Sequence, residues 1–169
     1  MPLITGTIKT VSVTKALAAT TNYTAEDVLS ESASAGTVWT FAAITRANGG
    51  SGYIVKAHVI CETTAQTPRL TFYLFTAAPT CNLNDNAANT ALVSADLANY
   101  VGKIDFPAME DLGGDSEAIA SPSTYGNLPL AFTCADNADD LLGVLVTRDA
   151  IAGETAGDDY TIRLTVEQL

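Results

Sequence analysis

Charged side chains are scarce in this chain, and basic ones are the scarcest. Charged residues make up 16% of the 169 positions, below the roughly 25% typical of globular proteins. Lysine and arginine number 8 against 19 aspartates and glutamates, which sets the formal net charge at -11. A nucleic-acid partner requires clustered Lys and Arg that neutralise phosphates. The composition therefore argues against nucleic-acid binding.

Long apolar segments are also missing. The first six residues contain no basic stretch followed by an apolar run, so we expect no secretory signal. The longest uncharged stretch, 118–135, is interrupted by Pro122 and Pro129, whereas a membrane helix needs about 20 predominantly apolar residues. We therefore expect no membrane partner, and folding in a reducing cytosol.

Cysteines are too few and too widely spaced to indicate a disulfide framework. Cys61 and Cys134 lie in runs typical of buried strands, Cys81 lies in a predicted loop, and no C-x-x-C motif is present. A buried free thiol behaves as a small hydrophobe. We favour three free thiols, with a disulfide-stabilised fold as the alternative.

Histidine is nearly absent, which restricts the catalytic chemistry. Nucleophilic catalysis needs a base beside the Ser or Cys that it activates. The single histidine, His58, lies between Ala57 and Val59 in a predicted strand with no neighbouring nucleophile. We interpret it as an imidazole on a sheet face with a local partner. Since one histidine and three scattered cysteines also make a poor zinc site, we predict a protein that is not an enzyme and has no cofactor.

Oxygen-bearing side chains gather in several predicted turns. Asn82-x-Asn84-x-Asn86 is similar to the start of a calcium loop, but the sixth position is Ala87 and the twelfth is Val93. These are the places of the turn glycine and the bidentate glutamate. The acidic stretches at 136–140 and 158–159 leave a hard cation open as an alternative. We interpret all three segments as solvated turns and predict no metal site.

Alternating apolar and polar residues dominate the remaining sequence. Runs of period 2 with β-branched and aromatic side chains are typical of strands. The pattern predicts an all-β protein, a jelly-roll-like antiparallel β-sandwich of about eight strands, as one domain over 1–169. The predicted strands are 4–13, 37–46, 52–63, 69–76, 101–106, 128–134, 141–148 and 160–166.

Several local details follow from this pattern. The glycine-rich segment 48–52 predicts a hairpin that pairs the second and third strands. In the third strand, Tyr53 and Val55 are expected on the same face as Ala57. In the second strand, Trp39 is expected in the core rather than as an exposed sugar-stacking platform. The fourth strand is bulky on both faces, so we expect it to be central.

Helical and irregular segments are few. One short helix is expected near 94–100, with Ser94 as its cap and Leu97 on its buried face. Thr24 and Asp27 have the spacing of a capping box, which predicts a weaker turn. The stretch 107–127 is predicted to be a long acidic loop.

Charge is distributed unevenly along the chain. Residues 1–80 carry five bases and four acids, while residues 81–169 carry three bases and fifteen acids. We expect the later loops to form a negative pole and another surface to stay nearly neutral. A near-neutral surface rich in Thr and Ala can bind a protein at low desolvation cost.

Five segments resemble one family of viral proteins. They are Leu74 to Thr80, Asp85 to Ala88, Ser94 to Phe106, Gly52 to Ala57 and Tyr160 to Val166. Together they are similar to the small β-sandwich head decoration, or auxiliary capsid, proteins of tailed bacteriophages. The motifs are structural rather than catalytic.

The resemblance implies a virion structural protein, a cement protein made in the host cytoplasm that binds the outside of the capsid. Its partner would be the major capsid protein, with self-association as a trimer or existence as a monomer both open. We assign the binding to residues 1–14 as a clamp strand, because a terminal strand can extend a neighbour's sheet. The candidate residues are Pro2, Leu3, Ile4, Thr5, Thr7, Ile8 and Thr10.

Other functions remain open from the sequence. One alternative is a phage tail or fibre module, or a carbohydrate-binding β-sandwich. An enzyme is a further alternative, because any two of the acids might face each other as a catalytic pair. No pair is singled out by its spacing.

Overall fold

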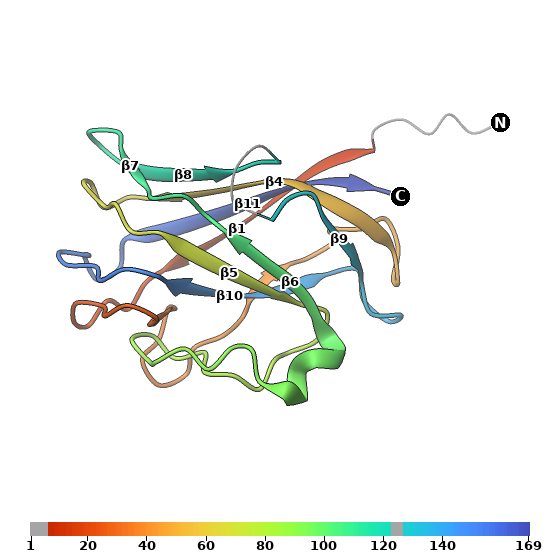
Figure 1. The fold of residues 1–169 in the computed structure, drawn as a ribbon, viewed down its shortest axis with the longest axis horizontal. Coiled ribbons are helices and arrows are strands. Elements are labelled where there is room, and N and C mark those ends of the chain that lie inside the picture. Colours follow the sequence, from red (N-terminus) through yellow and green to blue (C-terminus); the bar gives the residue numbers. More distant parts are fainter. Residues whose placement is uncertain (1–6, 123–126) are drawn as a thin grey trace.

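Two antiparallel sheets form a sandwich in the computed structural model, which describes residues 7–122 and 127–169 (Figure 1). The larger sheet contains β1 (Ile8–Ala16), β4 (Ser51–Cys61), β7 (Glu110–Asp111), β8 (Ser116–Ala120), β9 (Leu130–Thr133) and β11 (Asp159–Gln168). The smaller sheet contains β2 (Val28–Leu29), β3 (Trp39–Phe41), β5 (Leu70–Phe75), β6 (Tyr100–Asp105) and β10 (Leu141–Thr147). A short 3-10 helix, η1 (Ser94–Asn99), precedes β6.

The strand pairs are nested along the sequence. The first strand β1 pairs with the last, β11, and both β2 and β3 pair with β10. Further inward, β4 pairs with β8 and β9, and β5 pairs with β6. Successive pairs alternate between the two sheets, which is the strand order of a jelly roll. The predicted all-β sandwich is confirmed, but β2, β7 and β8 lie outside the eight predicted strands.

Every predicted strand overlaps a strand of the structure, and the predicted central strand, β5, lies between β10 and β6. The first strand is displaced along the chain, because it begins at Ile8 and ends at Ala16. The predicted acidic loop at 107–127 is wrong in part, since it contains β7 and β8. The inward residues of β8, Ser116, Ala118 and Ala120, are too small to produce a clear hydrophobic alternation.

The predicted hairpin between the second and third strands is wrong. β3 pairs with β10 in one sheet, whereas β4 pairs with β11 in the other. The glycine-rich segment therefore crosses between the sheets. Gly49 has a φ of 69°, which favours glycine. Gly50 lies where an added Cβ would be 2.6 Å from Thr45 Cβ, so glycine allows the close crossing.

A β-bulge at Val55 changes which side chains of β4 face the core. Thr165 pairs with Lys56 and Val166 pairs with Ile54, so Val55 has no partner in the ladder. A bulge shifts the alternation by one residue. Ile54 is consequently buried and Tyr53 is 39% exposed. The prediction that Tyr53 and Val55 share a face with buried Ala57 is wrong for this reason.

The predicted helix is present but differs in type and anchoring. η1 is a 3-10 helix whose N-cap is Val93, without a side-chain cap. Leu97 is 62% exposed rather than buried. Asp96 holds the segment instead, because its buried carboxylate accepts hydrogen bonds from the amide and the hydroxyl of Thr80.

The capping-box motif at Thr24 stabilises a turn that leads into a strand. The carboxylate of Asp27 accepts hydrogen bonds from the amide of Thr24 at 2.6 Å and from its hydroxyl at 2.9 Å. The chain then enters β2, so no helix follows.

An aromatic cluster fills the centre of the sandwich. Trp39 and Phe41 both meet the ring of Phe72 edge to face, at centroid distances of 6.4 and 5.7 Å. Trp39 is 1% exposed, which confirms its predicted place in the core and removes it as a platform for sugar binding. The thiols of Cys61 and Cys134 are buried as predicted, and Cys81 is buried as well; all three are free.

Replacing Gly143 by alanine is expected to disrupt this cluster. An added Cβ would lie 2.0 Å from Cζ of Phe72, and overpacking of this kind costs about 1–3 kcal/mol. Chemical denaturation should therefore show a lower free energy of unfolding for Gly143→Ala. The matched variant is Gly114→Ala, whose Cβ would meet nothing within 4 Å. Equal losses in both variants would contradict this packing argument.

Candidate functional site

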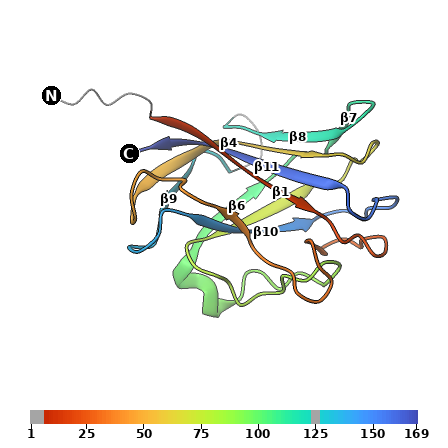
Figure 2. The same ribbon diagram turned by 180° about the vertical axis from the view of Figure 1, so that it is seen from behind.

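β1 is an edge strand of nine residues (Figure 2). Within the described part of the chain, β11 is its one ladder partner. The backbone of an edge strand offers unpaired N–H and C=O groups to another chain. β1 therefore offers an accessible sheet edge within the predicted binding segment.

The hydrogen-bond parity identifies which residues face outward. The amide of Gln168 donates to the carbonyl of Thr7, and the amide of Leu17 donates to the carbonyl of Asp158. Hydrogen-bonded pairs alternate in an antiparallel ladder, so the main-chain N–H and C=O groups of the odd-numbered residues face β11. The even-numbered residues turn their main-chain groups away from it. We call the first four of them the β1 edge: Ile8, Thr10, Ser12 and Thr14.

The side chains of the β1 edge are uncharged and exposed. Ile8 is 57% exposed, and the following alternate positions are all exposed. The hydroxyl of Thr14 lies 2.7 Å from that of Thr161 on β11. The hydroxyls of Thr10, Ser12 and Thr14 make this surface polar beside main-chain groups that have no ladder partner among the described residues. Such a surface fits an extended protein segment without the burial of a charge.

The opposite side of β1 is fastened to the rest of the sandwich by Lys9 and Lys15. The ammonium of Lys9 donates to the carbonyl of Ala43, and that of Lys15 donates to Glu31 at 2.6 Å. The Lys15 ammonium also lies 5.5 Å from the ring centroid of Trp39, within the range of a cation–π interaction. Both bases of β1 are therefore held at its inner face.

The carboxylate of Glu31 is the anchor for this side of β1. Burial by itself would raise the pKa of Glu31, but hydrogen bonds from Lys15 and Thr37 lower the pKa to about 2. Burial lowers the pKa of Lys15, against the opposing effect of Glu31. The ion pair is thus formed at neutral pH and connects the edge strand to the segment before β3.

The predicted binding residues divide into two groups. Thr7 directly precedes β1, and Ile8 and Thr10 lie at its start and belong to the β1 edge. Pro2, Leu3, Ile4 and Thr5 lie outside the described residues. Ser12 and Thr14 lie in the predicted clamp segment 1–14 but were not among its named candidate residues, although their alternation with Val11 and Val13 was a signal for them.

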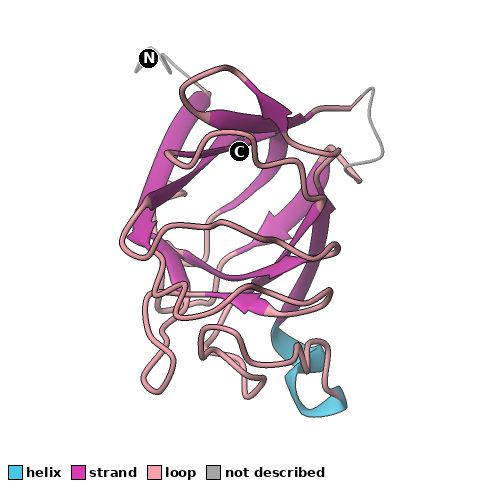
Figure 3. Ribbon diagram, turned by 90° about the vertical axis from the view of Figure 1, so that its left-hand side faces the viewer, coloured by secondary structure: helices cyan, strands magenta, loops and turns pink. Residues whose placement is uncertain are grey.

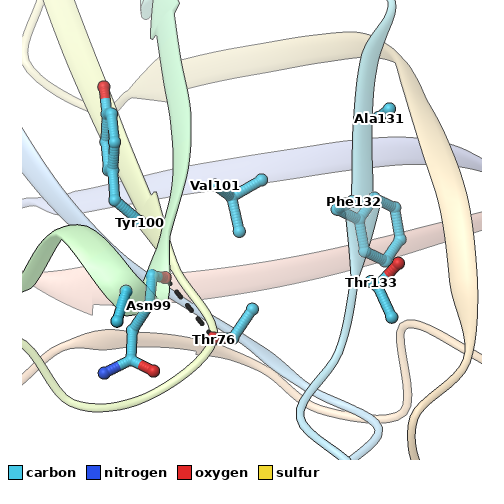
Figure 4. A pocket seen from close by; sticks show the side chains of 8 residues that line it. Thr76, Asn99, Tyr100, Val101, Ala131, Phe132 and Thr133 are labelled. Atoms are coloured by element: carbon cyan, nitrogen blue, oxygen red, sulfur yellow. Dashed lines mark hydrogen bonds between the residues drawn. The ribbon is translucent and has the colours of Figure 1, made fainter.

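A second candidate feature is a hollow of about 390 Å³ between β6 and β9 (Figure 4). Val101 lies between the two strands in this view, and Phe132 lies at β9. The lining contains no charged side chain: Thr76, Ala98, Asn99, Tyr100, Val101, Ala131, Phe132 and Thr133. The hollow suits an uncharged group. Sequence patterns did not identify it, because β6 and β9 belong to different sheets.

Another hollow, of about 300 Å³, gathers three of the chain's eight bases. Each base is already paired with a carboxylate: Arg69 with Asp149, Lys103 with Asp105, and Arg148 with Glu26, at 2.7, 2.9 and 2.6 Å. Hydrogen bonds from Arg69 lower the pKa of Asp149 to about 2. Because these pairs neutralise the bases, the hollow has no net positive charge to attract an anion.

Acidic side chains gather at one end of the sandwich, which faces the viewer in Figure 3. Four loops cross between the sheets there, at 17–27, 62–69, 106–115 and 148–158. They carry nine acids and two bases: Glu26, Asp27, Glu62, Glu110, Asp111, Asp115, Asp149, Glu154 and Asp158, with Arg69 and Arg148. The acidic end thus combines two early loops with two later ones, while the later acidic segment 136–140 packs elsewhere, against residues 44–49 before β4. The predicted pole of later loops is therefore only partly correct.

The oxygen-rich loop at 82–86 has a structural role. Asp85 is 3% exposed. Its carboxylate accepts hydrogen bonds from the amides of Ala19 and Ser30 and from the hydroxyl of Tyr23. The carboxylate thereby joins the loop to the segment between β1 and β2. In the described part of the chain, no group of three or more His, Cys, Asp or Glu residues is placed to hold a metal ion.

His58 lies on the outer face of the larger sheet. Its Nε2 is 2.7 Å from Oε2 of Glu117 on β8, which confirms the predicted sheet-face imidazole with a local partner. The pair connects the neighbouring strands β4 and β8.

Asp85→Ala should destabilise the protein strongly. The change leaves three donors without their carboxylate, and an unsatisfied buried group costs about 1–3 kcal/mol. We expect a loss of about 3 kcal/mol or more in the free energy of unfolding, measured by urea titration. Asn84→Ala is the control, because the Asn84 side chain accepts one bond, from the amide of Gly36. A loss for Asp85→Ala no greater than that of Asn84→Ala would refute the anchoring role.

Comparison with protein-family models, curated proteins and solved structures finds no match to this chain. The residues themselves therefore carry the functional argument. In the described residues, no helix has the length and apolar character needed to cross a membrane.

Proposed function

We propose that this protein is a non-enzymatic structural component of a bacteriophage virion that binds the outer surface of the capsid through the β1 edge. The observation that carries the proposal is the uncharged edge of β1, whose outward main-chain groups have no ladder partner among the described residues, in the segment assigned to binding from the sequence. The resemblance of the sequence to decoration proteins supplies the partner, the major capsid protein.

Strand addition gives this interaction a physical basis. An extended segment of the partner would pair with the outward N–H and C=O groups of the β1 edge, as peptides do when they extend a sheet. The exposed hydroxyls of Thr10 and Ser12 need little desolvation in such a contact. A capsid presents many copies of one binding site, so modest contacts can be reinforced by avidity if the protein self-associates.

The charge distribution favours one orientation. β1 runs toward the acidic end, so Ile8 and Thr10 are the members of the β1 edge farthest from the four acidic loops. With this part of β1 against the capsid, the loops would remain in solvent. Their repulsion of one another would then be screened by water and salt.

Purified virions provide the first test. A decoration protein is expected in a constant molar ratio to the major capsid protein after repeated washing, measured by quantitative mass spectrometry of the particles. Absence from washed particles, or a ratio that varies between preparations, would refute the proposed location.

Ser12→Pro tests the β1 edge itself. The Ser12 amide points away from β11, so proline removes an outward donor while the ladder to β11 keeps its bonds. We expect at least about tenfold weaker binding to particles that lack the protein, equivalent to about 1.4 kcal/mol. Cosedimentation measures the affinity, and circular dichroism verifies the fold.

The matched variant is Ser12→Ala, which removes the hydroxyl and retains the amide. Its binding should remain close to that of the unmodified protein. If Ser12→Pro is folded and binds as tightly as Ser12→Ala, binding does not use the main chain of β1.

A further inference from the structure

Two carboxylates meet at one hydroxyl at the acidic end. Thr63 follows β4, and Glu154 and Asp158 belong to the loop between β10 and β11. Oγ1 of Thr63 lies 2.6 Å from Oε1 of Glu154 and 2.7 Å from Oδ2 of Asp158. Both distances are those of O–H···O hydrogen bonds. The same hydroxyl therefore connects both acids to the end of β4.

These two contacts require two protons. A threonine hydroxyl has one proton to donate, and an ionised carboxylate has none. Thr63 can donate to one of its neighbours, so the other contact is a hydrogen bond only when that carboxyl is protonated and donates to Oγ1. Two full hydrogen bonds at Oγ1 of Thr63 therefore require that one of the two carboxyl groups carries a proton.

The position of Thr63 is itself constrained. Its carbonyl accepts hydrogen bonds from the hydroxyl of Ser116 at 3.1 Å and from the thiol of Cys61 at 3.3 Å. The loop must therefore adjust to Thr63, since the backbone at this point is attached to both β4 and β8. Loss of the bridging proton would therefore loosen the 148–158 loop rather than displace Thr63.

The surroundings favour Glu154 as the protonated partner. Its other oxygen, Oε2, accepts a hydrogen bond from the fully buried hydroxyl of Tyr160 at 3.1 Å. Asp158 faces it across Thr63, and Tyr23 and Cys61 are the other titratable groups near it. Burial raises the pKa of Glu154, and the charge of Asp158 adds to this effect against hydrogen bonds from Thr63 and Tyr160.

We infer that Glu154 and Asp158 share one proton across the Thr63 hydroxyl, and that this proton holds the 148–158 loop against the end of β4, so that the loop loosens when the proton leaves. The device is separate from the β1 edge. It makes the acidic end of the sandwich responsive to pH.

The direction of the response follows from linkage. A carboxyl that is protonated more readily in the folded state contributes stability at low pH, and this contribution is lost as pH rises through its folded-state pKa. Above that pH, two negative carboxylates compete for one donor. The loop is therefore held most firmly in acid and becomes easier to open toward neutral pH.

Carbon-13 NMR of the carboxyl groups tests the proton directly in the unmodified protein. The Glu154 signal should titrate at a pH above the ordinary glutamate value of 4.5. Thr63→Val removes the bridging hydroxyl with little change in shape, so the Glu154 signal should titrate at a different pH in this variant. Titration of Glu154 at or below its ordinary value in the unmodified protein would overturn the inference.

Hydrogen exchange tests the effect on the loop. After correction for intrinsic rates, amides of residues 152–158 should exchange faster at pH 8 than at pH 5, because the bridging proton is lost as the pH rises. Glu154→Gln stays neutral throughout and should abolish this change. Glu110→Gln, on exposed β7 at the same end, should retain it. A pH response that persists in Glu154→Gln, or is absent from the unmodified protein, would refute the device.

Discussion

The position of β11 between β1 and β4 is the constraint on which the remaining architecture depends. The last strand pairs with the first along nine residues and with β4 on its other side. This arrangement places the first and last strands in one sheet, and the inner pairs then nest between them. Because β1 has β11 as its ladder neighbour in the described structure, the same arrangement that completes the sheet also leaves its edge available.

Packing between the sheets depends on small side chains as much as on large ones. Gly143 leaves space for Phe72, which in turn meets Trp39 and Phe41. The bulge at Val55 has a comparable effect on the outer face, because it directs Ile54 inward and leaves Tyr53 exposed. In both places the backbone position decides which aromatic side chain is covered.

Charge separates the molecule into regions with different properties. The β1 edge has uncharged outward side chains, and the two lysines of β1 are held at the inner face of the strand. The acids of the four crossing loops occupy the end toward which β1 runs. This separation supports an edge that contacts protein and an end that remains in water. Within that end, the pairing of Glu154 and Asp158 at Thr63 shows that some acids are organised by hydrogen bonds rather than dispersed as solvated turns.

The sequence by itself determined the all-β class, the approximate positions of eight strands, the buried state of Trp39 and Cys61, and the partnered state of His58. Each depends on local alternation or on the chemistry of one side chain. It also located the N-terminal strand, including Ile8 and Thr10 of the candidate edge. Only the tertiary structure decided that β3 and β4 lie in different sheets, that Val55 is a bulge, that β8 forms from small residues, and that the backbone of β1 is open. Those features depend on hydrogen bonds between residues far apart in the chain, and a local pattern contains no information about which distant strand will be its partner.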